Sequence, residues 1–126
     1  MAEKLKGVFA ASMSVLKADL SLDIEATLKH SKTNLDDNGV GSAFFGSTGC
    51  GQLISVSEKK ELINSLSKMK FKEQILIGPS CNSLRETVNI MNYAVQKGMK
   101  NFLVMNPAYY KNNAVSYTHL TLPTKA

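Results

Sequence analysis

The chain alternates short, nearly continuous runs of apolar residues with longer segments in which apolar residues recur every three or four positions. The short runs predict strands, and the longer segments predict helices. Because the runs offer apolar side chains on both sides of a strand, we expect both faces to be covered, as in a parallel sheet. The expected strands cover residues 7–12, 40–45, 74–77 and 101–105.

Three helices are expected between these strands. The first would begin at Ser21 or Asp23, either of which can cap a helix, and would end at Gly39 in a left-handed cap. The other two begin with Ser-x-x-Glu capping boxes at residues 55–58 and 83–86. The residues expected to face the core are Ile24, Leu28, Leu35, Leu62, Ile63, Leu66, Met69, Val88, Met91 and Val95.

Strict alternation of strand and helix predicts an α/β fold with a parallel sheet and right-handed crossovers. The alternation of strands and helices does not distinguish the start of an eight-stranded βα barrel from a doubly wound open sheet. Polar or glycine-rich loops follow three strands, at residues 46–51, 78–82 and 106–111. In both architectures ligands bind at the carboxyl ends of the strands, so we expect the site there.

The length sets the number of domains, and the distribution of charge argues against nucleic-acid binding. The 126 residues are enough for one domain, and the net charge of +5 arises from 15 basic and 10 acidic residues. The lysines, Lys59 among them, are spread singly, which indicates a solvated surface. Arg85 is the single arginine, and no aromatic residues interleave with the basic ones, so nucleic-acid binding is not expected.

The cysteines and the amino-terminal apolar run indicate the cellular compartment of the protein. Cys50 and Cys81 form no C-x-x-C pair and have no adjoining histidines, so we expect neither a metal site nor a disulfide framework. Reduced thiols fit the cytoplasm. The apolar run at residues 7–16 is too short and too polar to cross a membrane, and it has no signal-peptide cleavage site.

The loop after the second strand carries the first candidate site. Gly46, Ser47, Thr48 and Gly49 place two hydroxyl groups between glycines at a strand-to-helix junction. Such a loop can present backbone N–H groups and hydroxyls to a carboxylate or a phosphate. It lacks the lysine of a phosphate-binding P-loop, and a tight turn with a Ser-Thr cap is the alternative interpretation.

Two adjacent tyrosines after the fourth strand form the second candidate. Tyr109 and Tyr110 follow Pro107, where a phenol could donate to a substrate or pass on a proton. Packing at a rim or at a subunit interface is the alternative interpretation.

Three motifs together resemble the dihydrodipicolinate synthase and N-acetylneuraminate lyase family of Schiff-base pyruvate aldolases. The first is Gly-Ser-Thr-Gly at residues 46–49, followed by Leu-Ile-Ser and a glutamate within residues 53–58. The second is Ile-Gly with a downstream Asn-Ser and glutamate, within residues 77–86. The third is Pro-Ala-Tyr-Tyr-Lys at residues 107–111. The similarity extends over residues 7–111.

The resemblance implies a (βα)8 barrel that binds pyruvate or another 2-keto acid as an imine on a lysine, without a cofactor, and joins it to or cleaves it from an aldehyde. It further implies that Ser47 and Thr48, in the loop bounded by Gly46 and Gly49, hold the carboxylate of the keto acid and that Thr48 relays protons. A tyrosine, Tyr109 or alternatively Tyr110, would join the relay across an interface in a dimer or tetramer.

The resemblance also implies a domain organisation. Residues 1–114 correspond to the amino-terminal half of the barrel, with four strands and three helices. The family's imine lysine and a second tyrosine follow later strands, so we expect the chain itself to be inactive. Residues 115–126 match a translated sequencing adapter and are expected to be non-native. The alternatives are a flavodoxin-like module that binds an anion or a phosphate, and a non-catalytic family member. Cys50 stands where the family usually has a glutamate, so the substrate within the family is left open.

Overall fold

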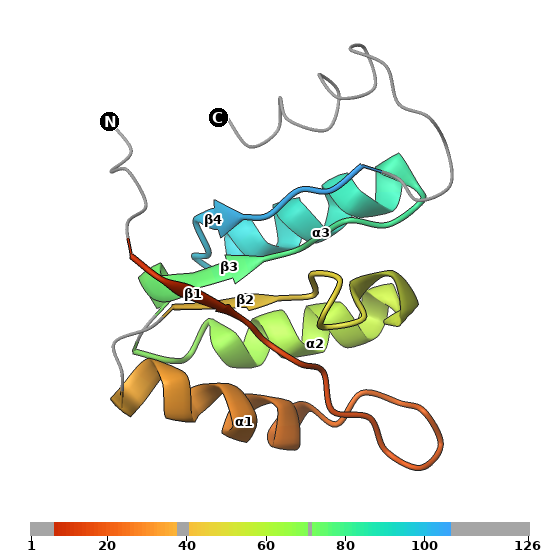
Figure 1. Ribbon diagram of the computed structural model, residues 1–126. Coiled ribbons are helices and arrows are strands. Elements are labelled where there is room, and N and C mark those ends of the chain that lie inside the picture. Colours follow the sequence, from red (N-terminus) through yellow and green to blue (C-terminus); the bar gives the residue numbers. More distant parts are fainter. Residues whose placement is uncertain (1–6, 38–40, 71, 107–126) are drawn as a thin grey trace.

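The computed structural model describes residues 7–37, 41–70 and 72–106, and the four predicted strands and three predicted helices are all present within them (Figure 1). In chain order the elements are β1 (Phe9–Ala11), α1 (Ile24–Asp37), β2 (Gly41–Phe44), η1 (Gly51–Leu53), α2 (Val56–Leu66), η2 (Lys72–Gln74), β3 (Ile75–Ile77), α3 (Leu84–Gln96) and β4 (Asn101–Phe102), where η denotes a 3₁₀ helix. Gly39 and residues 115–126 lie outside the described residues.

The strands form one parallel sheet in the order β1-β2-β3-β4. Each strand therefore pairs with its neighbour in the chain, and Phe9 of β1 lies opposite Gly41 of β2. A doubly wound sheet places its first strand inside the sheet, between strands that follow it in the chain. The sequential order is that of a barrel, so the fold is the first half of a (βα)8 barrel, as predicted.

All three helices cover the same face of the sheet. Right-handed crossovers between successive strands carry each helix to one side, and α2 contacts both α1 and α3 (Figure 1). The core lies between this helix layer and the sheet. Its fully buried residues include Phe44, Leu62, Ile63, Leu66, Ile75, Ile77, Ile90 and Ala94.

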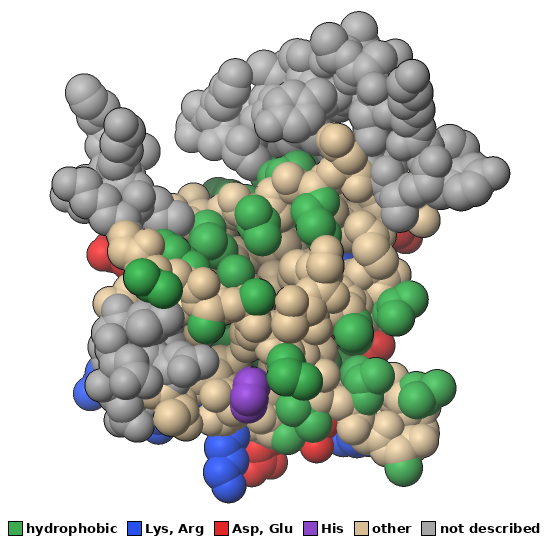
Figure 2. All heavy atoms as spheres, in the orientation of Figure 1, with side chains coloured by type: hydrophobic (Ala, Val, Ile, Leu, Met, Phe, Trp, Pro, Cys, Tyr) green, Lys and Arg blue, Asp and Glu red, His purple; other side chains and the backbone are tan. Residues whose placement is uncertain are grey.

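The opposite face of the sheet is only partly covered. Leu76 is half-buried and Ala11 is exposed, and Leu103 just after β4 is 41% exposed. Figure 2 shows hydrophobic side chains at the surface on the side where the strands lie. The expectation that both faces would be covered is therefore wrong for the described residues, because the inside of a barrel is filled by side chains from several strands.

The predicted helix caps explain where the helices begin. Of the two candidates for α1, Asp23 is the cap, and its carboxylate accepts a hydrogen bond from the amide of Ala26 at 3.0 Å. The hydroxyl of Ser55 accepts from the amide of Glu58 at 3.3 Å at the start of α2. The second capping box acts in the same way at the start of α3. No helix in the described part of the chain is long and apolar enough to span a bilayer.

Two predictions about helix faces are wrong. Val95 is 57% exposed. The buried face of α3 consists of Thr87, Ile90, Met91 and Ala94, and it ends at Ala94, one residue before Val95. Lys59 was expected at the solvated surface, yet its side chain is fully buried. Lys59 stands three and four residues before the core residues of α2, so the helical period places it on the buried face.

The core can be tested with two leucines that differ in burial. We expect Leu62→Ala to lower the free energy of unfolding by about 2–5 kcal/mol, because the fully buried side chain leaves a cavity. Leu53→Ala is the matched control, since Leu53 is 82% exposed, and should change it by less than about 0.5 kcal/mol. Urea unfolding followed by circular dichroism measures both; equal losses would contradict the described packing.

Candidate functional site

The carboxyl ends of the strands meet along one edge of the sheet, and hydrogen bonding continues past the strands into the loops. The amide of Gly78 donates to the carbonyl of Phe44 at 2.8 Å, and the amide of Leu103 donates to the carbonyl of Ile77 at 2.9 Å. The loops after β2, β3 and β4 are therefore held beside one another. This is the edge where the sequence predicts the site.

The loop after β2 is wound tightly. The amide of Gly51 donates to the carbonyl of Gly46 at 3.1 Å, and the amide of Cys50 donates to the carbonyl of Ser47 at 3.2 Å. Phe45 and Cys50, at its two ends, both have left-handed backbone conformations, with φ of 62° and 54°. Non-glycine residues rarely adopt this conformation, and such strain is concentrated at binding and active sites.

This winding leaves the tip of the loop free to bind. The side chains of Ser47 and Thr48 are exposed, whereas Gly46 and Gly49 are buried. Among the described residues, the amides of Ser47, Thr48 and Gly49 and the hydroxyl of Thr48 have no hydrogen-bond partner. Unpaired amides beside a free hydroxyl are the donors that an anion requires.

The exit of β1 packs closely against this loop. The hydroxyl of Ser14 donates to the carbonyl of Gly49 at 2.5 Å. A Cβ atom at Gly49 would lie 2.8 Å from the carbonyl oxygen of Ser12, so only glycine permits this approach. Sequence reasoning did not identify Ser14 as a residue that positions the loop; its place directly after the first strand was the available signal.

The exit of β4 approaches from the other side. The amide of Met105 donates to the hydroxyl of Ser80 at 2.7 Å, and the sulfur of Met105 lies 4.0 Å from the hydroxyl of Ser47. Tyr109 and Tyr110 follow shortly after Met105 but lie outside the described residues. Their place in the site therefore stays a prediction.

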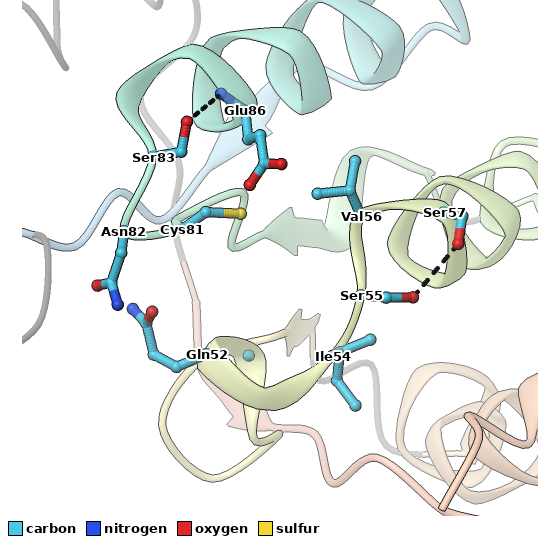
Figure 3. Close-up of a pocket in the computed structure, with 10 residues that line it drawn as sticks. Gln52, Ile54, Ser55, Val56, Ser57, Cys81, Asn82, Ser83 and Glu86 are labelled. Atoms are coloured by element: carbon cyan, nitrogen blue, oxygen red, sulfur yellow. Dashed lines mark hydrogen bonds between the residues drawn. The ribbon is translucent and has the colours of Figure 1, made fainter.

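A pocket of about 680 Å³ lies next to the loop, between the amino-terminal ends of α2 and α3 (Figure 3). Residues 51–57 and 81–86 contribute its lining, and Gln52 and Asn82 point toward each other across it. Residues 46–49 do not line it. The sequence signal for this pocket was the pair of capping boxes, which place two helix starts at the same edge of the sheet.

Two charged groups at the start of α2 have perturbed pKa values. The amide of Leu22 and the hydroxyl of Ser55 both donate to the carboxylate of Glu58 and lower its pKa. This carboxylate thus ties α2 to the segment that precedes α1. Burial lowers the pKa of Lys59.

Within the described residues, no group of acidic, histidine or cysteine side chains is arranged to hold a metal ion.

The close packing of the loop can be tested with two of its glycines. A Cβ atom at Gly51 would lie 2.1 Å from the carbonyl oxygen of Phe45, so we expect Gly51→Ala to lower the free energy of unfolding by about 1–3 kcal/mol. At Gly46 the nearest atom would be 3.9 Å away, in Leu103, so Gly46→Ala should stay within about 0.5 kcal/mol of the parent. Urea unfolding measures both, and equal stability of the two variants would contradict the loop geometry.

Similarity to known proteins agrees with the motifs. The sequence profile described as "Dihydrodipicolinate synthetase family" matches residues 4–120. The chain is 32% identical over 102 residues to 4-hydroxy-tetrahydrodipicolinate synthase of Chlamydia trachomatis serovar D, a match that covers 81% of this chain and 35% of that protein. It is 28% identical over 120 residues to N-acetylneuraminate lyase of Histophilus somni, covering 93% of this chain and 41% of that protein.

Solved structures show the same fold. YagE of Escherichia coli K12, a prophage protein of the dihydrodipicolinic acid synthase family in complex with pyruvate, matches with a TM-score of 0.80 and 25% identity over 94% of this chain and 41% of its own. CdNal of Clostridium difficile, in complex with mannosamine, matches with a TM-score of 0.83 and 20% identity over 96% of this chain and 44% of its own. The chain spans less than half the length of these four proteins. The match over residues 4–120 and the 32% identity show that the chain belongs to the dihydrodipicolinate synthetase family.

Proposed function

We propose that the chain is the amino-terminal part of a lyase or synthase that acts on pyruvate or another 2-keto acid through a lysine imine. The observation that carries the proposal is the loop tip at residues 47–49, where unpaired amides and the free hydroxyl of Thr48 lie at the carboxyl edge of the sheet. Family membership supports the reaction class, and pyruvate bound to YagE supports the substrate class.

In this proposal the loop holds the carboxylate of the keto acid. The amides of Ser47, Thr48 and Gly49 have no partner among the described residues, so they can donate to carboxylate oxygens without breaking a bond of the fold. Gly49 lets the backbone pack closely beneath them, since a Cβ atom there would lie 2.8 Å from the carbonyl oxygen of Ser12. A carboxylate fixed at this edge orients the adjacent keto carbon toward an attacking amine.

Proton transfer is assigned to the hydroxyl of Thr48 together with a phenol. Imine formation requires that the carbonyl oxygen leave as water, and a hydroxyl with a free lone pair can pass the necessary protons. Thr48 meets this condition, since its hydroxyl is exposed and unpaired among the described residues. Tyr109, or alternatively Tyr110, would complete the relay across the interface of a dimer or tetramer.

The imine lysine is assigned to a later strand, outside residues 1–126. Lys59 cannot serve, because its side chain is fully buried, whereas Ser47 and Thr48 at the loop tip are exposed. The second substrate would be an aldehyde. The two cysteines are free, which supports a reducing compartment, and we place the protein in the cytoplasm.

Borohydride trapping tests the imine. The longer protein that contains the remaining strands is incubated with pyruvate and borohydride, with the 126-residue chain as the matched control. We expect one reduced pyruvate per longer chain, on a lysine beyond residue 126, and none on the shorter chain. Intact-mass measurement and peptide mapping locate the adduct. A folded longer protein without an adduct would instead support a non-catalytic family member.

The role of Thr48 is tested separately in the longer protein. We expect Thr48→Val to lower kcat by about 100-fold or more, because it removes the hydroxyl and keeps the shape of the side chain. Thr48→Ser, which keeps the hydroxyl, should retain most of the turnover. Steady-state kinetics measures the effect, and thermal unfolding checks that the variants are folded. Equal turnover of the valine and serine variants would remove Thr48 from the relay.

A further inference from the structure

Lys59 contacts Cys81, which lines the pocket. The side-chain nitrogen of Lys59 lies 3.8 Å from the sulfur of Cys81 and donates to the carbonyl of Ser80 at 3.1 Å. Lys59 comes from α2, whereas Cys81 lies in the loop between β3 and α3. Two nucleophilic groups, a thiol and an amine, are thus held together from different elements of the fold.

Burial shifts Lys59 toward its neutral amine. Its side chain is fully buried, and no carboxylate among the described residues lies within ion-pair distance of it. Burial lowers its pKa, and the neighbouring Cys81 and Glu86 oppose the shift more weakly. The ring of Phe45, 5.7 Å from the nitrogen, is a cation–π partner and also favours the charged form. A neutral amine has the lone pair that an attack on sulfur requires.

Cys81 is reached from the opposite side. Its side chain is half-buried and free, and it lines the pocket between the starts of α2 and α3. Figure 3 shows its sulfur turned toward the space between the two helix starts. A small oxidant can therefore approach the sulfur from the pocket while Lys59 contacts it from the core.

We propose that Lys59 and Cys81 form an oxidant-responsive pair, in which a peroxide oxidises the thiol and the lysine amine traps the product as a sulfur–nitrogen bond. The sulfur first attacks one peroxide oxygen, the oxygen–oxygen bond breaks, and a sulfenic acid and one water are formed. The lysine nitrogen then attacks the sulfur, and the hydroxyl leaves with a proton from nitrogen as a second water. The pair loses two hydrogen atoms, and the peroxide is reduced to two waters.

The sulfur–nitrogen bond would join α2 to the loop before α3. Its formation requires the lysine nitrogen to leave the carbonyl of Ser80, which the flexible four-carbon stem permits. Two small thiols would reverse it, becoming a disulfide as the cysteine and the amine are regenerated. The trap also protects the cysteine from irreversible oxidation to the sulfinic acid.

The test uses Cys50→Ser in the full 126-residue chain, which leaves Cys81 as the single cysteine and excludes an intramolecular disulfide. After circular dichroism confirms folding, the protein is treated with hydrogen peroxide and weighed intact. We expect a loss of two hydrogen masses that dithiothreitol restores. Peptide mapping should show a missed tryptic cleavage after Lys59 and a peptide joined to the one that contains Cys81.

Two lysine variants in the same background give the matched comparison. Lys59→Met, or Lys59→Arg if the first does not fold, should leave a sulfenic acid that dimedone labels, without the mass loss. Lys60→Met is the control, because Lys60 contacts Asn89 instead and should keep the full mass loss. A folded Cys50→Ser protein that shows only dimedone-reactive or more highly oxidised Cys81, or a mass loss that persists without Lys59, would overturn the proposal.

Discussion

The packing of glycine backbone against the carbonyl of Phe45 is the constraint on which the carboxyl edge of the sheet depends. A Cβ atom at Gly51 or at Gly78 would lie 2.1 Å or 2.6 Å from this oxygen, so the loops after β2 and β3 close over the same atom. The left-handed conformation of Phe45 turns the chain there, and its ring lies 5.7 Å from the side-chain nitrogen of Lys59. One residue therefore shapes the proposed carboxylate loop and also the setting of the buried lysine.

Ser80 connects the same two regions by hydrogen bonds. Its carbonyl accepts from Lys59 on the core side, and its hydroxyl accepts from the amide of Met105 at the exit of β4. Because Ser80 is itself buried, neither bond is replaced by water at low cost. Chemistry at the lysine would therefore change the hydrogen bonding of a residue that helps to hold the strand exits together, next to the loop of Ser47 and Thr48.

The sequence predicted the elements well, because strands and capped helices depend on local patterns that recur in three successive βα units and a fourth strand. The alternation of strands and helices could not by itself choose between a barrel and an open sheet, since the two differ only in strand order, and the resemblance of the loop motifs to a known family predicted the barrel. Lys59 was misplaced because charge was weighed above its position on the helix, and Val95 because the stripe was extended one residue too far. The loop of Ser47 and Thr48 was placed at the correct edge, but the pocket between the helix starts needed three-dimensional proximity to be seen.

The order of the strands has a consequence for how the molecule is made. Each strand pairs with the one that precedes it in the chain, so every new βα unit adds at the growing end of the sheet. Synthesis on the ribosome delivers the chain in the same direction, and each unit can dock as it emerges. A doubly wound sheet must instead add later strands on both sides of its first. The sequential sheet can thus assemble from its amino-terminal strand onward. Because every pairing joins successive strands, the chain segments that must be closed into loops are as short as this topology allows.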